Sequence, residues 1–491
     1  MTTSPAPNTQ KNLDTLKNSG VPAQTHWAQF IPLLSVFFFW GFVAASNDIL
    51  IPVFKQAFAL SQEQSQYVSL TFYIAYTVGS LLYLLTSWLI KEDVVNKLGY
   101  KNSLTLGLGI SASGTLLFYP AANMLSFPLM LSGLFIVGLG FSLQQTAANP
   151  LAISLGSIST GSQRLTLAGG INNFGTTIGP LIVSFAIFGV HSSEPAAISI
   201  EGVKLPYLIL GVTFLLVAVF LKFSAIPDRP SLIDTASNNQ SGSALRYPQL
   251  GFGMIAIFLY VGVEVSTASN LPAYMETKGF LTKDIAPYIS LYWASLMIGR
   301  WAGAVEAFSF DVSLAKIMKF LAPYLAFTVF LLVNAIAKHD LSPFYVYGLI
   351  VLLLIAVDML SQGNPAKMLL LSSVCGIVAL IIGMCSSGML SIYAFTSVGL
   401  FCSTLWPCIF TLAISGLGKH TGQASNYLIM MIMGGGVVSW LQGLMADKVG
   451  IQLSYMVGLF CFSYLMFYSW KVKIILEKQG ICLDKIADSS H

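Results

Sequence analysis

The chain of 491 residues is 55% hydrophobic and only 9% charged, which excludes a soluble globular protein, where roughly a quarter of the residues are charged. The net charge of +4 is not gathered into a basic stripe, so nucleic-acid binding is not expected. No HExxH, GxSxG or phosphate-loop motif occurs, and the cysteines and histidines lack ligand spacing. We therefore expect an all-α integral membrane protein in a lipid bilayer, with no enzyme activity, cofactor or metal site.

Apolar runs long enough to cross about 30 Å of hydrocarbon predict about fourteen membrane helices. In the first half they lie at 28–58, 65–90, 102–122, 125–150, 165–190 and 205–225. In the second half they lie at 248–271, 284–308, 315–337, 343–361, 367–386, 388–417, 421–446 and 451–472. The remaining polar segments are a tail at 1–27, a Ser/Pro/Asn-rich linker at 226–247 and a tail at 473–491. The helical segments thus form two units, 28–225 and 248–472.

Charge placement predicts the orientation of the chain. If the N-terminus is cytoplasmic, most of the 24 Lys and Arg residues lie in the tails and in turns on the same side. Positive residues favour the cytoplasmic side of a membrane. We therefore expect both termini in the cytoplasm, in a multi-pass protein of the plasma membrane, which would be the inner membrane of a bacterium.

The two halves share short repeats, as transporter folds do. LAIS occurs at 151–154 and again at 412–415, and AASN at 44–47 resembles TASN at 267–270. The spacing between matching segments grows along the chain, which indicates an insertion in the second half. We identify it as an inserted hairpin of two helices at about 312–362.

Asp48 lies inside the first apolar run, in WGFVAASNDILIP at 40–52. An ionised side chain at mid-bilayer costs about 2.5–3.5 kcal/mol, so such residues generally face a polar cavity or an ion path. At helical spacing Trp40 and Asn47 share the face of Asp48. The alternative is that Asn47 and Asp48 only cap a helix that is broken before Pro52.

Buried amides follow in the fourth and fifth runs. The fourth carries Gln144, Gln145 and Asn149, with Pro150 interrupting the helix, and the fifth carries Asn172 in LAGGINNFGTTIGP. Amides are costly to bury, so this set predicts the lining of a wet cavity.

The seventh run holds a second acid, Glu264, with Tyr260 on the same helix face. Arg300, in the eighth run, is expected near the cytoplasmic end as an anchor or latch. Several aromatic residues are candidates to stack on the faces of a sugar ring, although each is also compatible with simple packing. They are Trp40, Tyr73, Tyr76, Tyr292, Trp293 and Trp406.

The chain resembles the fucose/galactose/glucose branch of the major facilitator superfamily. The matching stretches are NDILIPVF at 47–54, QTAANPLA at 145–152, LAGGINNFGTTIGP at 167–180, FLYVGVEV at 258–265 and 406–438. The resemblance implies the major facilitator fold, two six-helix bundles that alternate access to a central sugar site, here with the inserted hairpin.

The resemblance also implies that Asp48 is the ion-coupling carboxyl and that Glu264 matches an acid of the glucose/galactose members. The fucose symporter has glutamate where this chain has Gln145 and glutamine where it has Gly169, whereas Asn172 is retained. These departures favour glucose or galactose over fucose as the substrate.

We therefore expect a monomeric secondary active importer that carries a hexose by cation symport, with H⁺ favoured over Na⁺. Asp48 and Glu264 would couple the ion. The sugar would contact residues from both halves: Trp40, Asn47, Gln144, Gln145, Asn149, Asn172, Tyr260 and Trp406. Alternatives are a sugar-sensing receptor with a transporter-like fold, or a carrier of a lipid-like amphiphile.

Overall fold

The computed structural model describes residues 25–92, 94–156, 161–188, 201–228, 244–305, 312–417 and 421–481, and all regular structure in them is helical. The first half contains α2 (Trp27–Ala57), α3 (Gln62–Ser65), α4 (Tyr67–Ile90), α5 (Val94–Leu98), α6 (Tyr100–Leu116), α7 (Phe118–Asn123), α8 (Phe127–Ser154), α9 (Gly161–Phe188) and α10 (Glu201–Phe223). The second contains η2 (Ala244–Arg246), α11 (Pro248–Glu276), α12 (Thr282–Ala304), α13 (Val312–Ile336), η4 (Ser342–Phe344), α14 (Tyr347–Ser361), α15 (Pro365–Cys385), α16 (Gly388–Cys402), α17 (Leu405–Ile414), α18 (Thr421–Met430), η6 (Met431–Met433), α19 (Gly434–Val449), α20 (Ile451–Ser454) and α21 (Met456–Lys478).

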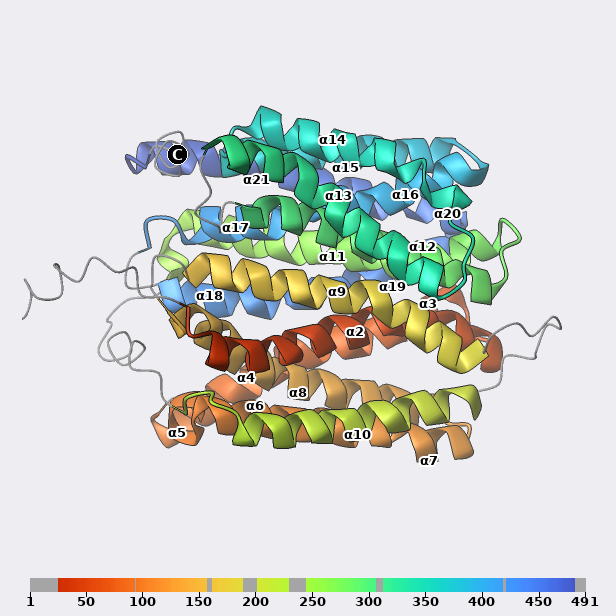
Figure 1. The fold of residues 1–491 in the computed structure, drawn as a ribbon, viewed down its shortest axis with the longest axis horizontal. Coiled ribbons are helices and arrows are strands. Elements are labelled where there is room, and N and C mark those ends of the chain that lie inside the picture. The colour runs from red at the N-terminus through yellow and green to blue at the C-terminus, as the bar shows by residue number, and fades with distance from the viewer. Residues whose placement is uncertain are drawn as a thin grey trace, which may run out of the picture.

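The long helices run side by side along one direction of the molecule (Figure 1). The short helices α3, α7 and α20 lie at one end, which we call the α3 end, and α5 and α18 lie at the opposite end, the α5 end. Within the described residues, 12 helices are long and apolar enough to cross a membrane. Each predicted apolar run matches one helix or a series of consecutive helices. α9 is less apolar because it is rich in Gly, Asn and Thr, and α12 is less apolar because it carries Lys283, Asp284 and Arg300. The count of about fourteen spans therefore stays a prediction.

Buried apolar side chains form two cores that follow the two halves of the chain. One core lies within residues 30–226 and the other mostly within 244–476. Ala45, Ile49, Leu181 and Val183, on α2 and α9 of the first half, join the second core. The halves are thus packed separately and touch through α2 and α9, among other helices.

Glycines let one pair of helices in each half cross at backbone contact. A Cβ on Gly175 of α9 would lie 2.2 Å from the Phe38 carbonyl oxygen of α2. A Cβ on Gly434 of α19 would lie 1.9 Å from the Phe258 carbonyl oxygen of α11. Small residues at such crossings allow the close helix packing that replaces hydrophobic association inside a membrane. These crossings fix α2 and α11, the helices that carry Asp48 and Glu264.

Two helix breaks are absent, the expected one at Pro150 and the alternative one before Pro52. α2 continues through Pro52 to Ala57, and α8 continues through Pro150 to Ser154. Proline removes a backbone donor, so the carbonyl of Asp48, four residues before Pro52, loses its helical partner while neighbouring helices hold the segment in place. The interpretation of Asn47 and Asp48 as caps of a broken helix is therefore wrong.

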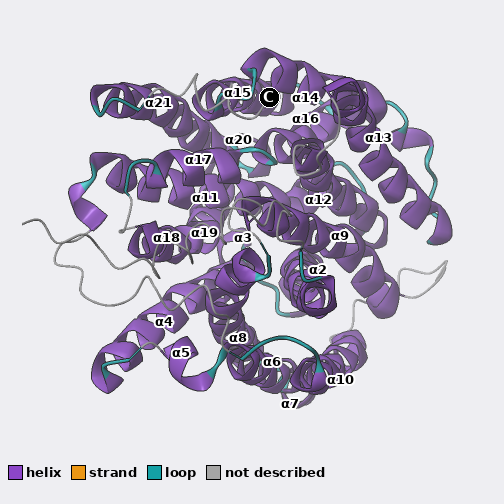
Figure 2. Ribbon diagram, turned by 60° about the vertical axis from the view of Figure 1, so that its left-hand side comes forward, coloured by secondary structure: helices purple, strands orange, loops and turns teal. Residues whose placement is uncertain are grey.

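The predicted hairpin corresponds to α13, η4 and α14, at the margin of the molecule (Figure 2). α13 packs against α12 and reaches α9, whereas α14 packs against α15 and α16. Polar contacts tie the hairpin to the second half. The hydroxyls of Tyr347 and Ser295 lie 2.7 Å apart, and the Tyr393 hydroxyl of α16 donates to the Pro343 carbonyl of η4. A marginal position agrees with an insertion, although the division of the chain at 312–362 stays a prediction.

The glycine crossing predicts that Gly175→Ala destabilises the protein. The added methyl forces α2 and α9 apart, and overpacking of this kind costs about 1–3 kcal/mol. The matched control is Gly109→Ala on α6, where a Cβ meets nothing within 4 Å. Thermal unfolding of the detergent-solubilised protein should show a lower Tm for Gly175→Ala and an unchanged or higher Tm for Gly109→Ala. Equal Tm values for both variants would contradict the crossing.

Candidate functional site

Asp48 is a buried carboxyl at the boundary between the halves. It lies on α2, and its side chain is only 2% exposed. Its Oδ2 accepts a hydrogen bond of 2.8 Å from Nε1 of Trp293, which lies on α12 of the second half. The contact joins two residues that are 245 positions apart in the sequence.

Glu264 on α11 has different surroundings. Its carboxylate accepts a hydrogen bond from the Tyr260 hydroxyl, one helical turn earlier. The Tyr292 hydroxyl donates to the Glu264 backbone carbonyl at 2.7 Å. The Arg300 guanidinium of α12 acts electrostatically on the carboxylate. A cation of the same half therefore acts on Glu264.

Tyrosines connect the two acids into one site. Tyr73 of α4 interacts electrostatically with both Asp48 and Glu264, and so does Tyr292 of α12. The rings of Tyr73 and Tyr76 stack at 6.1 Å, and Gln145 donates to the Tyr76 hydroxyl at 3.3 Å. Five helices, α2, α4, α8, α11 and α12, thus bring acids, hydroxyls, an amide and ring faces to the middle of the molecule.

Two further predicted residues lie on the side of the second half. Tyr260 and Trp406 have ring centroids 6.2 Å apart, and Trp406 also stacks on Phe410 at 6.2 Å. Tyr260 therefore joins this aromatic pair to Glu264.

Other predicted residues make their hydrogen bonds inside the first half. Trp40 Nε1 donates to Gln144 Oε1 at 3.0 Å, and Gln144 Nε2 donates to Ser111 at 3.1 Å. Both side chains are almost fully buried, and their partners fit a packing role. Asn172 donates to the Phe37 carbonyl of α2 at 3.0 Å and so reinforces the crossing of α2 and α9.

Asn149 is half-buried on α8, and Asn47 is buried beside Asp48. The Oδ1 atom of Asn47 has no hydrogen-bond partner among the described residues. An unsatisfied buried acceptor is costly, so this atom is available to a ligand donor or a water.

Additional contacts join α9 to α12 across the halves. Arg300 Nη1 donates to Asn173 Oδ1 at 3.3 Å, and Ser290 Oγ donates to the Thr177 carbonyl at 2.6 Å. Trp293 was predicted only as an aromatic residue for stacking, and Arg300 only as an anchor or latch. Their spacing in the sequence could have connected these residues, because Ser290, Trp293 and Arg300 lie on one face of a helix.

The halves are closed against each other at the α3 end. The Asp447 carboxylate accepts the backbone N–H groups of Gln62 and Glu63 at 2.9 and 2.8 Å. Trp440 Nε1 donates to Glu63 Oε1 at 3.0 Å, and Gln62 Nε2 donates to Asn270 Oδ1 at 3.0 Å. These contacts tie α3 of the first half to α11 and α19 of the second.

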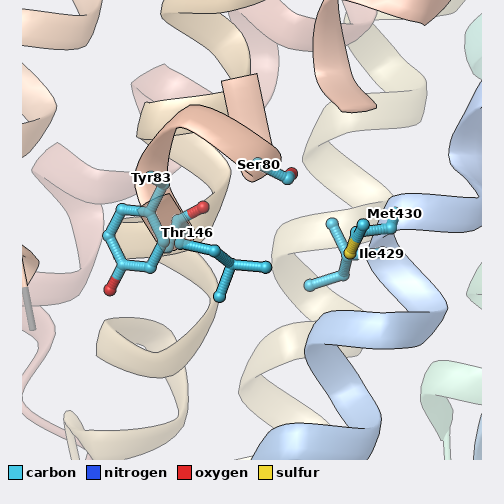
Figure 3. A pocket seen from close by; sticks show the side chains of 6 residues that line it. Ser80, Tyr83, Thr146, Ile429 and Met430 are labelled. Atoms are coloured by element: carbon cyan, nitrogen blue, oxygen red, sulfur yellow. The ribbon is translucent and has the colours of Figure 1, made fainter. Parts of the chain in front are cut away.

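A small pocket of about 20 Å³ lies between the halves, towards the α5 end from the acids. Ser80, Tyr83 and Thr146 of α4 and α8 face Ile429 and Met430 of α18 across it (Figure 3). Thr77 closes one side, because its hydroxyl donates to the Met430 carbonyl at 3.0 Å. Thr146, which lines this space, is the sequence neighbour of Gln145.

Curated relatives match almost the whole chain. A glucose/galactose transporter of Brucella abortus biovar 1 is 30% identical over 439 residues, covering 89% of this chain and 92% of that protein. The L-fucose-proton symporter of Escherichia coli K12 is 28% identical over 465 residues, covering 90% and 92%. These matches confirm the resemblance inferred from the five sequence stretches.

Solved structures agree with this assignment. The transporter FucP in the outward conformation matches with a TM-score of 0.58 and 25% identity, covering 91% of this chain and 99% of that one. A bacterial homologue of the lysosomal transporter Spinster, inward-facing, matches at 0.53 with 13% identity, covering 92% and 98%, which shows the fold alone. The family and fold are those of transporters, which confirms that the chain is not an enzyme. Since the family model also matches residues 33–366, the chain belongs to the Major Facilitator Superfamily.

Proposed function

We propose that the protein is a secondary active transporter that carries a hexose together with a cation by alternating access. Glucose or galactose is the favoured sugar class, and H⁺ is favoured over Na⁺. Support for the sugar comes from the names of the relatives, a glucose/galactose transporter and an L-fucose-proton symporter. The ring faces of Tyr260 and Trp406 and the amide of Gln145 have the chemistry that a polyhydroxylated ring requires.

The observation that carries the ion coupling is the environment of Asp48. Its hydrogen-bond partner is the neutral indole of Trp293, and no Lys or Arg among the described residues acts on it. A buried carboxyl without a cation is stable as the neutral acid, so it can bind and release a proton. Glu264 faces Arg300, which stabilises its charged form. We propose Asp48 as the proton carrier and Glu264 as a fixed charge beside the sugar.

The proposed orientation places the α5 end and both termini in the cytoplasm, in the inner membrane of a bacterium. The contacts of Asp447 with α3 then close the outer side. The neighbouring cavity at Ser80 and Met430 lies towards the inner side. This arrangement corresponds to the inward half of a transport cycle, and we propose that a monomer completes it.

The decisive experiment measures uptake into liposomes that contain the purified protein. Labelled glucose, galactose and fucose are supplied under an inward proton gradient, an inward Na⁺ gradient, or neither. We expect the proton gradient to drive glucose or galactose accumulation at fixed Na⁺. One proton moving through a potential of about 150 mV supplies roughly 3.5 kcal/mol, enough for an accumulation of a few hundredfold. Uptake that requires Na⁺ and ignores the proton gradient would refute proton coupling.

Asp48→Asn should abolish accumulation while leaving sugar exchange measurable. The amide keeps the shape of the carboxyl but cannot gain or lose a proton. Glu264→Gln is the comparison variant, since it removes an acid that Arg300 balances, and it should weaken sugar binding while retaining accumulation driven by protons. Gradient-driven uptake and exchange in the same liposomes check both outcomes. If Asp48→Asn accumulates sugar as the wild type does, or if only Glu264→Gln loses accumulation, the coupling would belong to Glu264.

Deletion of residues 312–362 should leave sugar preference unchanged, because α13 and α14 lie at the margin of the molecule. Removing two spans together also preserves the orientation of the following helices. Competition of unlabelled sugars against labelled galactose measures the preference. Removing only 342–362 is the control, which should invert the downstream helices and abolish uptake. A folded deletion variant with altered preference would contradict the peripheral placement.

A further inference from the structure

The hydrogen bond from Trp293 to Asp48 exists only while the two halves are in the present arrangement. Trp293 is 5% exposed and Asp48 2% exposed, so water does not compete for either partner. Ser290 and Arg300, on the same face of α12, bond to Thr177 and Asn173 of α9. This face of α12 is therefore held against the first half, and any movement of α12 away from α2 removes the donor from Asp48.

The ionisable groups around Asp48 are few among the described residues. Tyr73 of α4 and Tyr292 of α12 interact with it electrostatically, and both also face Glu264. On α9, which packs along α2, the residues beside this part of α2 carry no ionisable side chain: Gly179 lies against Ser46, and Leu181 and Val183 share the core of Ala45 and Ile49. The indole N–H is therefore the hydrogen-bond donor that stabilises a negative charge on Asp48 in this arrangement.

An indole N–H is a donor only, and it carries no charge. A hydrogen bond to an ionised carboxylate is roughly twice as strong as one to the neutral acid. The donor thus favours the ionised form of Asp48, whereas burial without a donor favours the protonated form. Arrangement of the halves and protonation of Asp48 are consequently linked.

We propose that Trp293 is a positioning residue. When α12 approaches α2, its indole N–H promotes release of the proton from Asp48. With the α3 end closed, the indole stabilises the carboxylate and so lowers the cost of releasing the proton. When α12 withdraws, Asp48 loses its donor and takes up a proton. This inference rests on the proposed proton symport and identifies the residue that ties the proton to the conformational change.

Reciprocity gives a second consequence. If closure favours loss of the proton, protonation of Asp48 must favour separation of α12 from α2 by the same factor. The neutral acid therefore weakens the very contact that holds this part of the interface. Asp48 acts as the ion site and as one half of a link between the bundles.

Trp293→Phe tests the inference, because it retains a ring and removes the N–H donor. The readout is the pH at which galactose binding by the purified protein falls to half, measured by calorimetry between about pH 5 and pH 10. Without its donor the carboxyl keeps its proton at higher pH, so the midpoint should move upwards. The loss of a hydrogen bond to a charged group changes the equilibrium roughly tenfold or more, which is a shift of about one pH unit.

Two further variants separate this effect from general damage to the site. Trp293→His retains a ring N–H and should move the midpoint less than Trp293→Phe. In an Asp48→Asn background, Trp293→Phe should have no further effect on pH dependence, as expected for one interaction in a double-mutant cycle. Size-exclusion chromatography checks that each variant is folded.

The outcomes are distinct. An upward shift in Trp293→Phe that disappears in the Asp48→Asn background supports the inference. A weaker affinity with an unchanged midpoint overturns it and leaves proton symport intact, because the ring then serves only packing or sugar stacking. Wild-type binding without any pH midpoint, together with uptake that ignores the proton gradient, overturns the proposed symport and this inference with it.

Discussion

The burial of a carboxyl group between two helical bundles is the constraint on which the arrangement of this protein depends. A charge in hydrocarbon is costly, and every backbone polar group in the bilayer must find a partner within the protein. Both acids meet this constraint by facing inwards from helices that cross a neighbour at glycine contacts. The crossing at Gly175 directs α2, and the crossing at Gly434 directs α11. Asp48 and Glu264 are consequently presented to the same central space from opposite halves.

The two crossings use glycine in the same way within each half. Gly175 contacts the Phe38 carbonyl of α2, and Gly434 contacts the Phe258 carbonyl of α11. Gly436, two residues further along α19, serves a different purpose, because a Cβ there would lie 2.8 Å from Leu70 Cα of α4 in the other half. The glycine run of α19 therefore supports packing within its half and closure between the halves, whereas α9 contacts the opposite half through the side chains and carbonyls of Asn173 and Thr177.

Hydropathy was sufficient to predict the helical segments and the acids, because lipid imposes long apolar runs in which Asp48 and Glu264 stand out. It could not predict that α2 and α8 continue through Pro52 and Pro150, since the packing of neighbouring helices decides whether a proline ends a helix. Nor could it separate Trp40, which bonds to Gln144 within the first half, from Trp293, which bonds to Asp48 across the halves. Partner choice depends on three-dimensional contacts that periodicity along one helix does not contain.

The two acids differ in the charge of their surroundings, and under the proposed symport this difference assigns the proton to one of them. Arg300 acts electrostatically on Glu264, whereas Asp48 has the neutral indole of Trp293 as its partner. In the proposed cycle, the charge of Asp48 would be stabilised only while α12 lies against α2. A fourth-helix acid at Gln145 would add a second titrating group near Tyr76 without a matching donor from the opposite half. The neutral amide at that position would therefore keep the coupling on one carboxyl, which is the simplest way to tie one proton to one movement of the halves.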